Sequence, residues 1–201
     1  MRQSRESRAA SRATQGHLSL RSVEVVRTYL ALESPAQFRP SSADAPGARL
    51  VRHAPCSVAT YRRLYRDVGQ QWFWHERLEW TDDALRKHLE SPHVHVWELF
   101  VGAESAGYFE LYRQDDGAVE IGYFGITPPF IGRGLGGWLL TRAVREAHAL
   151  GATRVWLHTC TLDSPNALPA YKARGFREFR TERLLVEIDG SHVVSERILR
   201  D

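Results

Sequence analysis

The stretch AVEIGYFGITPPFIGRGLGGWLLTRAVREAHALG, residues 118–151, decides the fold of this chain. It begins as a strand, passes through a turn containing Gly132, Gly134 and Gly136, and continues as a helix whose apolar residues recur at spacings of three and four. Gly151 ends that helix. A glycine-rich turn that opens a helix presents unpaired N–H groups and a partial positive charge. The stretch therefore predicts a phosphate site, with a tight turn that binds no ligand as the alternative.

The spacing of the glycines narrows the kind of phosphate ligand. A P-loop would end in Gly-Lys-Ser/Thr, and this turn has no such ending. A dinucleotide-binding turn reads Gly-x-Gly-x-x-Gly and opens an early βαβ unit, whereas here the register is Gly-x-Gly-x-Gly and two strands precede it. Both of these nucleotide-binding classes are therefore disfavoured.

The glycine register, preceded by an acidic strand, resembles motif A of the GCN5-related N-acetyltransferases, which hold the pyrophosphate of acetyl-CoA. The family pattern is Arg/Gln-x-x-Gly-x-Gly/Ala, and Ile131 stands at its first position, so the phosphate contact of that side chain is missing here. The resemblance implies acetyl-CoA as cosubstrate. The expected donor-site residues are Tyr123, Phe124, Gly125, Ile126, Gly132, Arg133, Gly134, Leu135, Gly136, Gly137 and Ser164.

Two further motifs support this resemblance. Tyr171-Lys-Ala-Arg-Gly175-Phe176 resembles the family's Tyr-x-x-x-Gly-Phe ending. Ser164-Pro-Asn-Ala167 resembles its Asn-x-x-Ala opening, with Ser164 in the position of the Asn.

The order of predicted elements matches the same family over residues 48–199. It implies an α/β (mixed α+β) fold: a central mixed sheet with an antiparallel meander over 94–126, a parallel crossover through the helix after Gly134, and flanking helices. Residues 48–201 are the expected acetyltransferase domain. Residues 23–47 are expected to form an extra strand and a Pro-, Ser- and Ala-rich linker or covering loop.

The positive charge of the chain is concentrated in residues 1–22. This segment carries five Arg and one Glu, while the remaining residues hold 22 Lys and Arg against 23 Asp and Glu. We expect a disordered basic tail before a nearly neutral domain. Nucleic-acid binding through the tail is a minor alternative, which salt-dependent retention would reveal.

Acyl transfer to an amine requires removal of a proton from the amine and return of one to the leaving thiolate. Glu120 is the expected base, because the resemblance places a catalytic glutamate on this strand, and strict alternation puts it opposite Val119, Ile121 and Tyr123. Glu110 on the neighbouring strand is the reserve. Tyr171 is the expected acid, and backbone N–H groups around residues 123–126 would bind the developing oxyanion.

Aromatic residues after the first helix predict the acceptor side. Trp72, Trp74 and His75 lie just beyond Gly69, where a loop can present them to an apolar body or a cationic amine. The expected acceptor is a small-molecule amine. A protein or N-terminal acetyltransferase and a non-catalytic acyl-CoA-binding module are the alternatives.

Other chemistries have weaker sequence support. Cys56 and Cys160 are too few for a disulfide framework, and the histidines show no ligand spacing, so we expect no metal. A small buried thiol is the expected state of Cys160, and His158 is expected to be structural or on the acceptor side. No apolar run is long enough for a bilayer, and a reducing cytoplasm fits best. Members of the family often dimerise, so a homodimer is compatible with the resemblance.

Overall fold

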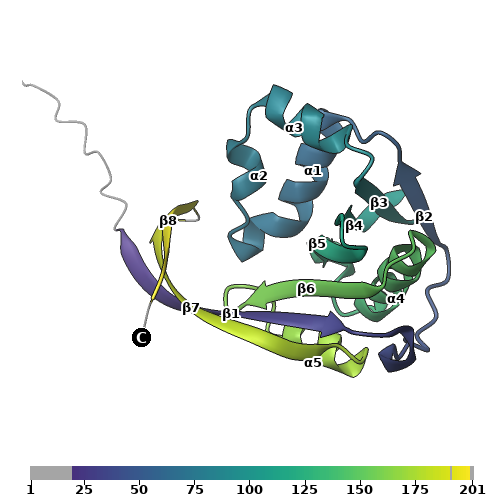
Figure 1. The fold of residues 1–201 in the computed structure, drawn as a ribbon. Helices are drawn as coiled ribbons and strands as arrows, with labels where there is room; N and C mark the ends of the chain where they lie inside the picture. Colours follow the sequence, from purple (N-terminus) through teal and green to yellow (C-terminus); the bar gives the residue numbers. More distant parts are fainter. Residues whose placement is uncertain (1–19, 191, 200–201) are drawn as a thin grey trace, which may run out of the picture.

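One mixed sheet forms the centre of the protein. A computed structural model describes residues 20–190 and 192–199. Its eight strands run in the order β2-β3-β4-β5-β6-β1-β7-β8 (Figure 1). Only β5 and β6 are parallel neighbours. The strands are β1 Arg21–Leu32, β2 Ala48–His53, β3 Val94–Val101, β4 Glu104–Arg113, β5 Ala118–Ile126, β6 Arg154–Cys160, β7 Arg177–Asp189 and β8 His192–Ile198.

Helices cover both faces of the sheet. On one face α1 (Val58–Gly69), α2 (Glu76–Glu79) and α3 (Asp82–Leu89) lie over β3 to β5 (Figure 1). On the other face α4 (Leu135–Ala149) and α5 (Ala167–Ala173) pack on the main core. Ser57 accepts a hydrogen bond from the backbone N–H of Thr60 at 3.1 Å, which fixes the start of α1. The mixed fold with its meander and parallel crossover is as the sequence predicts.

The strand predicted over residues 23–32 lies inside the sheet. It is β1, which pairs antiparallel with β6 on one side and with β7 on the other. Leu30 lies opposite Leu157 and Glu178, and its side chain is buried in the main core. Sequence patterns identify a strand but not its partners, which here are more than 120 residues away along the chain.

The segment between β1 and β2 packs against the second helical layer. Its backbone donates from Arg39 to the carbonyl of Arg174 at 3.0 Å and from Ser41 to the hydroxyl of Thr141 at 2.8 Å. These hydrogen bonds hold the segment as a covering loop over the first half of α4 and the end of α5. Of the predicted basic tail, residues 1–19 lie outside the described residues.

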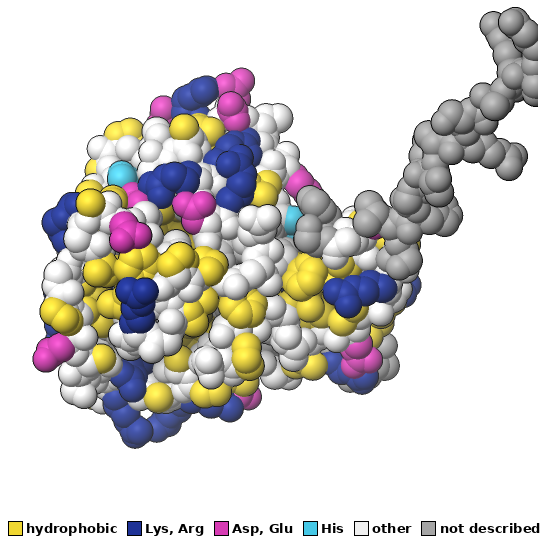
Figure 2. Space-filling model, turned by 180° about the vertical axis from the view of Figure 1, so that it is seen from behind, with side chains coloured by type: hydrophobic (Ala, Val, Ile, Leu, Met, Phe, Trp, Pro, Cys, Tyr) yellow, Lys and Arg dark blue, Asp and Glu magenta, His cyan; other side chains and the backbone are white. Residues whose placement is uncertain are grey.

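Charged side chains are dispersed over the face of the molecule that Figure 2 shows. Figure 2 shows Lys and Arg side chains at several separate places on one face of the molecule, interspersed with Asp and Glu. Nothing in this view forms the continuous basic stripe that nucleic-acid binding uses. Within residues 20–190 and 192–199, the helices are all too short or too polar to cross a bilayer.

The position of β1 predicts a large difference between two substitutions on one face of it. Leu30→Ala removes a fully buried side chain (0% exposed) and should destabilise the protein by about 2–5 kcal/mol. Val26→Ala changes a side chain that is 36% exposed and should cost less than about 1 kcal/mol. Urea unfolding measures both. Equal, small effects of the two substitutions would contradict the central, buried position of β1 in the sheet.

Candidate active site

The site begins where two parallel strands separate. β5 and β6 are paired only from Ala118 to Glu120, although both strands continue beyond that point. A bulge contributes to the separation: Glu110 pairs with Tyr123 and Leu111 with Ile121, so Gly122 is an extra residue in β5. A cavity of about 350 Å³ lies along the separated ends. Its walls come from both strands, the glycine turn, α5 and the aromatic residues 72–75.

The glycine turn forms one end of this cavity. Gly132 and Gly134 have φ angles of 83° and 77°, a region that other residues rarely adopt, and Gly134 is the N-cap of α4. Gly136 and Gly137 also line the cavity. A Cβ at Gly136 would meet no atom within 4 Å, so a ligand has room against the helix N-terminus. The turn therefore fits an anionic group such as a pyrophosphate.

The predicted donor-site residues divide into two groups. Arg133, Gly134 and Leu135 are not in the cavity wall, and the guanidinium of Arg133 lies 4.8 Å from the centre of the Phe130 ring. Ile131, which replaces the family's Arg or Gln, is in the wall and 47% exposed. The others all line the cavity: Tyr123, Phe124, Gly125, Ile126, Gly132, Gly136, Gly137 and Ser164.

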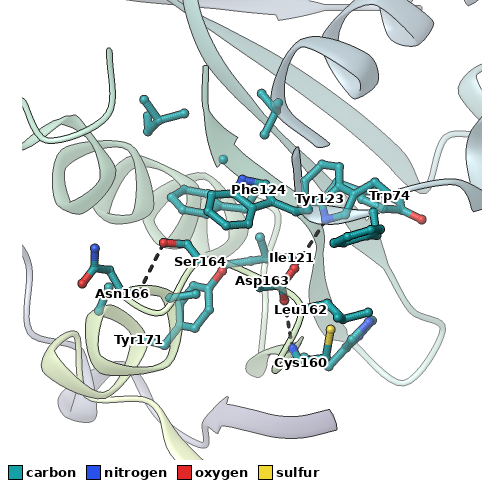
Figure 3. A pocket seen from close by; sticks show the side chains of 18 of the residues that line it. Trp74, Ile121, Tyr123, Phe124, Cys160, Leu162, Asp163, Ser164, Asn166 and Tyr171 are labelled. Carbon is teal, nitrogen blue, oxygen red and sulfur yellow. Dashed lines mark hydrogen bonds between the residues drawn. The ribbon is translucent and has the colours of Figure 1, made fainter. Parts of the chain in front are cut away.

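Tyr171 reaches the cavity from α5. It is 8% exposed, and its ring packs between Phe124 and Phe176 with centroid distances of 6.2 Å to each. Figure 3 shows its hydroxyl directed toward Ile121 and Asp163. Burial, and then the negative charge of Asp163, raise the pKa of Tyr171 above its usual value. The phenol therefore keeps its proton at neutral pH.

Glu120 lies beside the cavity rather than in its wall. Burial, followed by the charge of Glu110, raises the pKa of its carboxyl from 4.5 to about 7. The expectation that Tyr123 lies on the opposite face is wrong. Because Gly122 is inserted in the bulge, Tyr123 packs with the α1 layer, to which Glu120 also points, whereas Ile121 joins the core under α4.

The reserve carboxylate, Glu110, is in a different environment. Its side chain accepts hydrogen bonds from the hydroxyl of Tyr61 and lies 3.0 Å from Nε2 of His88. It is almost fully buried under α1 and α3 and is absent from the cavity wall. Glu110 therefore anchors helices to the sheet, and its charge acts on Glu120 from a distance.

The three predicted acceptor residues all line the cavity, on the segment Gln70–Glu76, which we call the aromatic loop. Trp74 has a second, structural role. Its indole packs on Gly69, where a Cβ would collide with it, and Nε1 donates to Oδ1 of Asp163 at 3.5 Å (Figure 3). Phe73 adopts a left-handed conformation with φ of 61° and packs on the cluster of β1, β7 and β8. The aromatic loop therefore contacts α1 through Trp74 and the cluster of β1, β7 and β8 through Phe73.

Several residues in the cavity wall were not predicted. Arg27 comes from β1 and Glu196 from β8. Nη2 of Arg27 donates hydrogen bonds to Oε1 and Oε2 of Glu196 at 2.9 and 2.8 Å. Asp163 accepts from the hydroxyl of Thr159 at 2.7 Å and the N–H of Cys160 at 2.9 Å, so it fixes the end of β6. Its position in the turn directly after β6 was a usable signal. The sequence contains no signal for the contribution of β1 and β8, because that contribution depends on long-range strand pairing.

Comparison with known proteins identifies the family. Residues 61–176, more than half of the chain, match the model of the Acetyltransferase (GNAT) family. The chain belongs to this family. The match covers the first helix, the glycine turn and the Tyr171 motif, and it confirms the family and the acyltransferase class predicted from the sequence. Among the described residues, groups of three or more potential metal ligands are absent.

Individual relatives are distant. The chain is 29% identical over 125 residues to N-alpha-acetyltransferase RimI of Mycobacterium tuberculosis, which covers 59% of this chain and 74% of that protein. A GCN5-related N-acetyltransferase from Sphaerobacter thermophilus superposes with a TM-score of 0.62 at 18% identity, over 86% of this chain and 56% of its own. An aminoglycoside acetyltransferase from an uncultured soil metagenomic sample gives 0.54 at 16% identity, over 64% and 87%. This chain thus spans less than two thirds of the Sphaerobacter protein, and the structural likenesses establish the fold alone.

The raised pKa of Glu120 predicts a pH-dependent gain in stability on its removal. Below pH 4.5 the carboxyl is protonated in the folded and the unfolded state, so Glu120→Gln should change little there. Between pH 4.5 and about 7 the unfolded wild type loses the proton of Glu120 while the folded protein retains it. The variant should therefore become more stable than wild type over this range, by up to about 3 kcal/mol, and the gain should level off above pH 7. Urea unfolding between pH 4 and 9 tests this. Glu104→Gln, at an exposed position on β4, is the control and should show no such trend.

Proposed function

We propose that this protein is an N-acetyltransferase that moves an acetyl group from acetyl-CoA to the amine of a small-molecule acceptor. The observation that carries the proposal is the single cavity that connects the glycine turn with the separated ends of β5 and β6 and with the aromatic loop. Donor and acceptor would occupy its two ends together. Direct attack of the amine on the thioester then needs no covalent enzyme intermediate.

The donor end relies on the backbone more than on side chains. Gly132 and Gly136 leave room for phosphate oxygens at the N-terminus of α4, a 15-residue helix, whereas Gly137 lets Ser41 of the covering loop approach closely. Ile131 brings no charge, and Arg133 lies over a ring instead of the cavity. The thioester of acetyl-CoA supplies an activated acyl group. Backbone groups of residues 123–126 line the cavity where its carbonyl would lie.

The proposed proton chemistry uses Glu120 and Tyr171. Glu120, with a pKa of about 7, is suited to receive a proton from the acceptor near neutral pH. Tyr171, protonated and directed into the cavity, is suited to return a proton to the leaving thiolate (Figure 3). Burial, and then the charge of Asp163, raise the pKa of Cys160 to about 11, which disfavours this thiol as a nucleophile.

The acceptor end favours a small amine with an apolar or aromatic body. Trp72, Phe73, Trp74 and His75 line it, and rings of this kind hold apolar groups or cations. Trp74 is hydrogen-bonded to Asp163 and Phe73 packs on the cluster of β1, β7 and β8, so the aromatic loop is held against the cavity, which favours a compact acceptor. The likeness to RimI favours the second candidate, acetylation of a protein N-terminus.

Thiol release from acetyl-CoA over an amine panel tests the function. The panel should contain aromatic and aliphatic monoamines, polyamines, aminoglycosides and peptides with free N-termini. Turnover with aromatic or apolar small amines, and little with peptides, is the expected result. Turnover with peptides alone would support the second candidate. Tight CoA binding with no turnover on any amine would identify a binding module and overturn the proposal.

Gly136 offers a clean test of the donor end. Gly136→Glu should abolish CoA binding, because the carboxylate would occupy the phosphate space and repel the ligand. Gly136→Ala is the matched control, since the position is helical with open space beside it. The control should fold at least as stably as wild type and bind CoA with less than a tenfold loss. Calorimetry with CoA measures both. A folded Gly136→Glu variant with wild-type affinity would contradict the donor site.

A further inference from the structure

His158 occupies the place between the cavity and Glu120. It lies on β6 with its side chain in the cavity wall, whereas Glu120 is not in the wall. Nδ1 of His158 is 3.8 Å from Oε1 of Glu120. An amine that enters the cavity therefore meets the imidazole before it meets the carboxyl group.

The N-terminal strand holds this imidazole in place. Tyr29 of β1 lies opposite His158 in the sheet, and the two rings pack with centroids 5.6 Å apart. The hydroxyl of Tyr29 donates to Oε2 of Glu182 on β7 at 2.6 Å, which fixes the tyrosine in turn. Because Nδ1 faces Glu120, Nε2 is the nitrogen left for a ligand in the cavity.

The charges around His158 favour its neutral form. Burial, and then the positive charge of Arg27 on β1, lower its pKa below the usual value. Three acidic side chains oppose this effect: Asp163 after β6, Glu76 on α2 and Glu196 on β8. Glu196 is paired with Arg27, which leaves its influence on the imidazole small. At neutral pH the ring is thus free to accept a proton.

We propose that His158 is the catalytic residue that takes the proton from the acceptor amine and passes it to Glu120. This inference rests on the proposed acetyltransferase function and adds a residue to it. With the neutral ring protonated at Nδ1, the N–H bond of the amine breaks as Nε2–H forms. A small rotation of the two side chains brings Nδ1 and Oε1 from 3.8 Å to hydrogen-bond distance, and the Nδ1–H bond then breaks as the carboxyl O–H of Glu120 forms. The lone pair of the acceptor nitrogen forms the bond to the acyl carbon, and the electron pair of the broken N–H bond stays on the nitrogen. The C–S bond breaks with its electron pair on sulfur, and Tyr171 protonates the resulting thiolate.

The carboxylate of Glu120 and the imidazole of His158 have different tasks in this relay. Glu120 must be ionised to receive the proton, so kcat/KM for the acceptor should rise with pH through about 7 and then level off. His158 makes the contact with the amine, so its removal should impair transfer at every pH. It should leave the donor end, on the far side of the cavity, unchanged.

Kinetics of five variants, among them Glu120→Gln alone, test the proposal. His158→Gln and His158→Ala should each lower kcat/KM for the acceptor by about 10²-fold or more, with unchanged affinity for CoA. Added imidazole should partly restore His158→Ala. The double variant of His158→Gln and Glu120→Gln should be no slower than the slower single variant, because both belong to one relay. His93→Gln, far from the cavity, is the control and should match wild type.

A spectroscopic measurement tests whether the ring can accept a proton. The imidazole resonances of His158, followed by NMR in the protein without ligand, should titrate below pH 6.5, so that the ring is neutral at pH 7; a ring that is already protonated at pH 7 would contradict the relay. Wild-type rates and pH profiles in folded His158→Gln would overturn the proposal and leave the acetyltransferase function standing. Wild-type protein that releases no CoA with any amine would overturn the function and the proposal together.

Discussion

Three pairs of residues hold β5 and β6 together, and everything at the site depends on their parting after Glu120. A sheet that stayed paired would satisfy the backbone of residues 121–126 internally and leave no cavity. The bulge at Gly122 helps to turn β5 away, and Asp163 fixes the end of β6, so the backbone in between is available to a ligand. The glycine turn, Tyr171 and the aromatic loop are arranged around that opening.

The local features of the fold were predictable from the sequence because they depend on neighbours in the chain. The glycine turn, the helix that it opens and the cap at Ser57 follow from residue types and short spacings. The position of β1 and the face of Tyr123 do not. The first requires partners more than 120 residues away, and the second depends on one inserted residue, which reverses the alternation that a pattern assumes. The candidate site was predicted where it uses motif residues, and His158 was expected to be structural or on the acceptor side. The site was missed at Arg27 and Glu196.

Two carboxylates on neighbouring strands show how surroundings assign roles. Glu110 is held by Tyr61 and His88 and ties helices to the sheet. Glu120 has no such partners at hydrogen-bond distance among the described residues, and it is buried near the charge of Glu110, so its pKa rises toward neutrality. The fold thus accepts a destabilised carboxyl beside the cavity, a feature common at functional sites. Trp74, by contrast, combines two roles in one side chain, since its indole both lines the cavity and packs on α1.

The order of strands also bears on how the chain is made. β1 is synthesised before both of its neighbours in the sheet, because β6 and β7 follow it by at least 120 residues. Until they arrive, a strand with two unpaired edges must be kept from pairing with other chains. Pairings of such high sequence separation form slowly, so closing of the sheet around β1 belongs to the last steps of folding. Arg27 then reaches the cavity and Tyr29 packs against His158, so the site becomes complete only when β6, β7 and β8 have been synthesised.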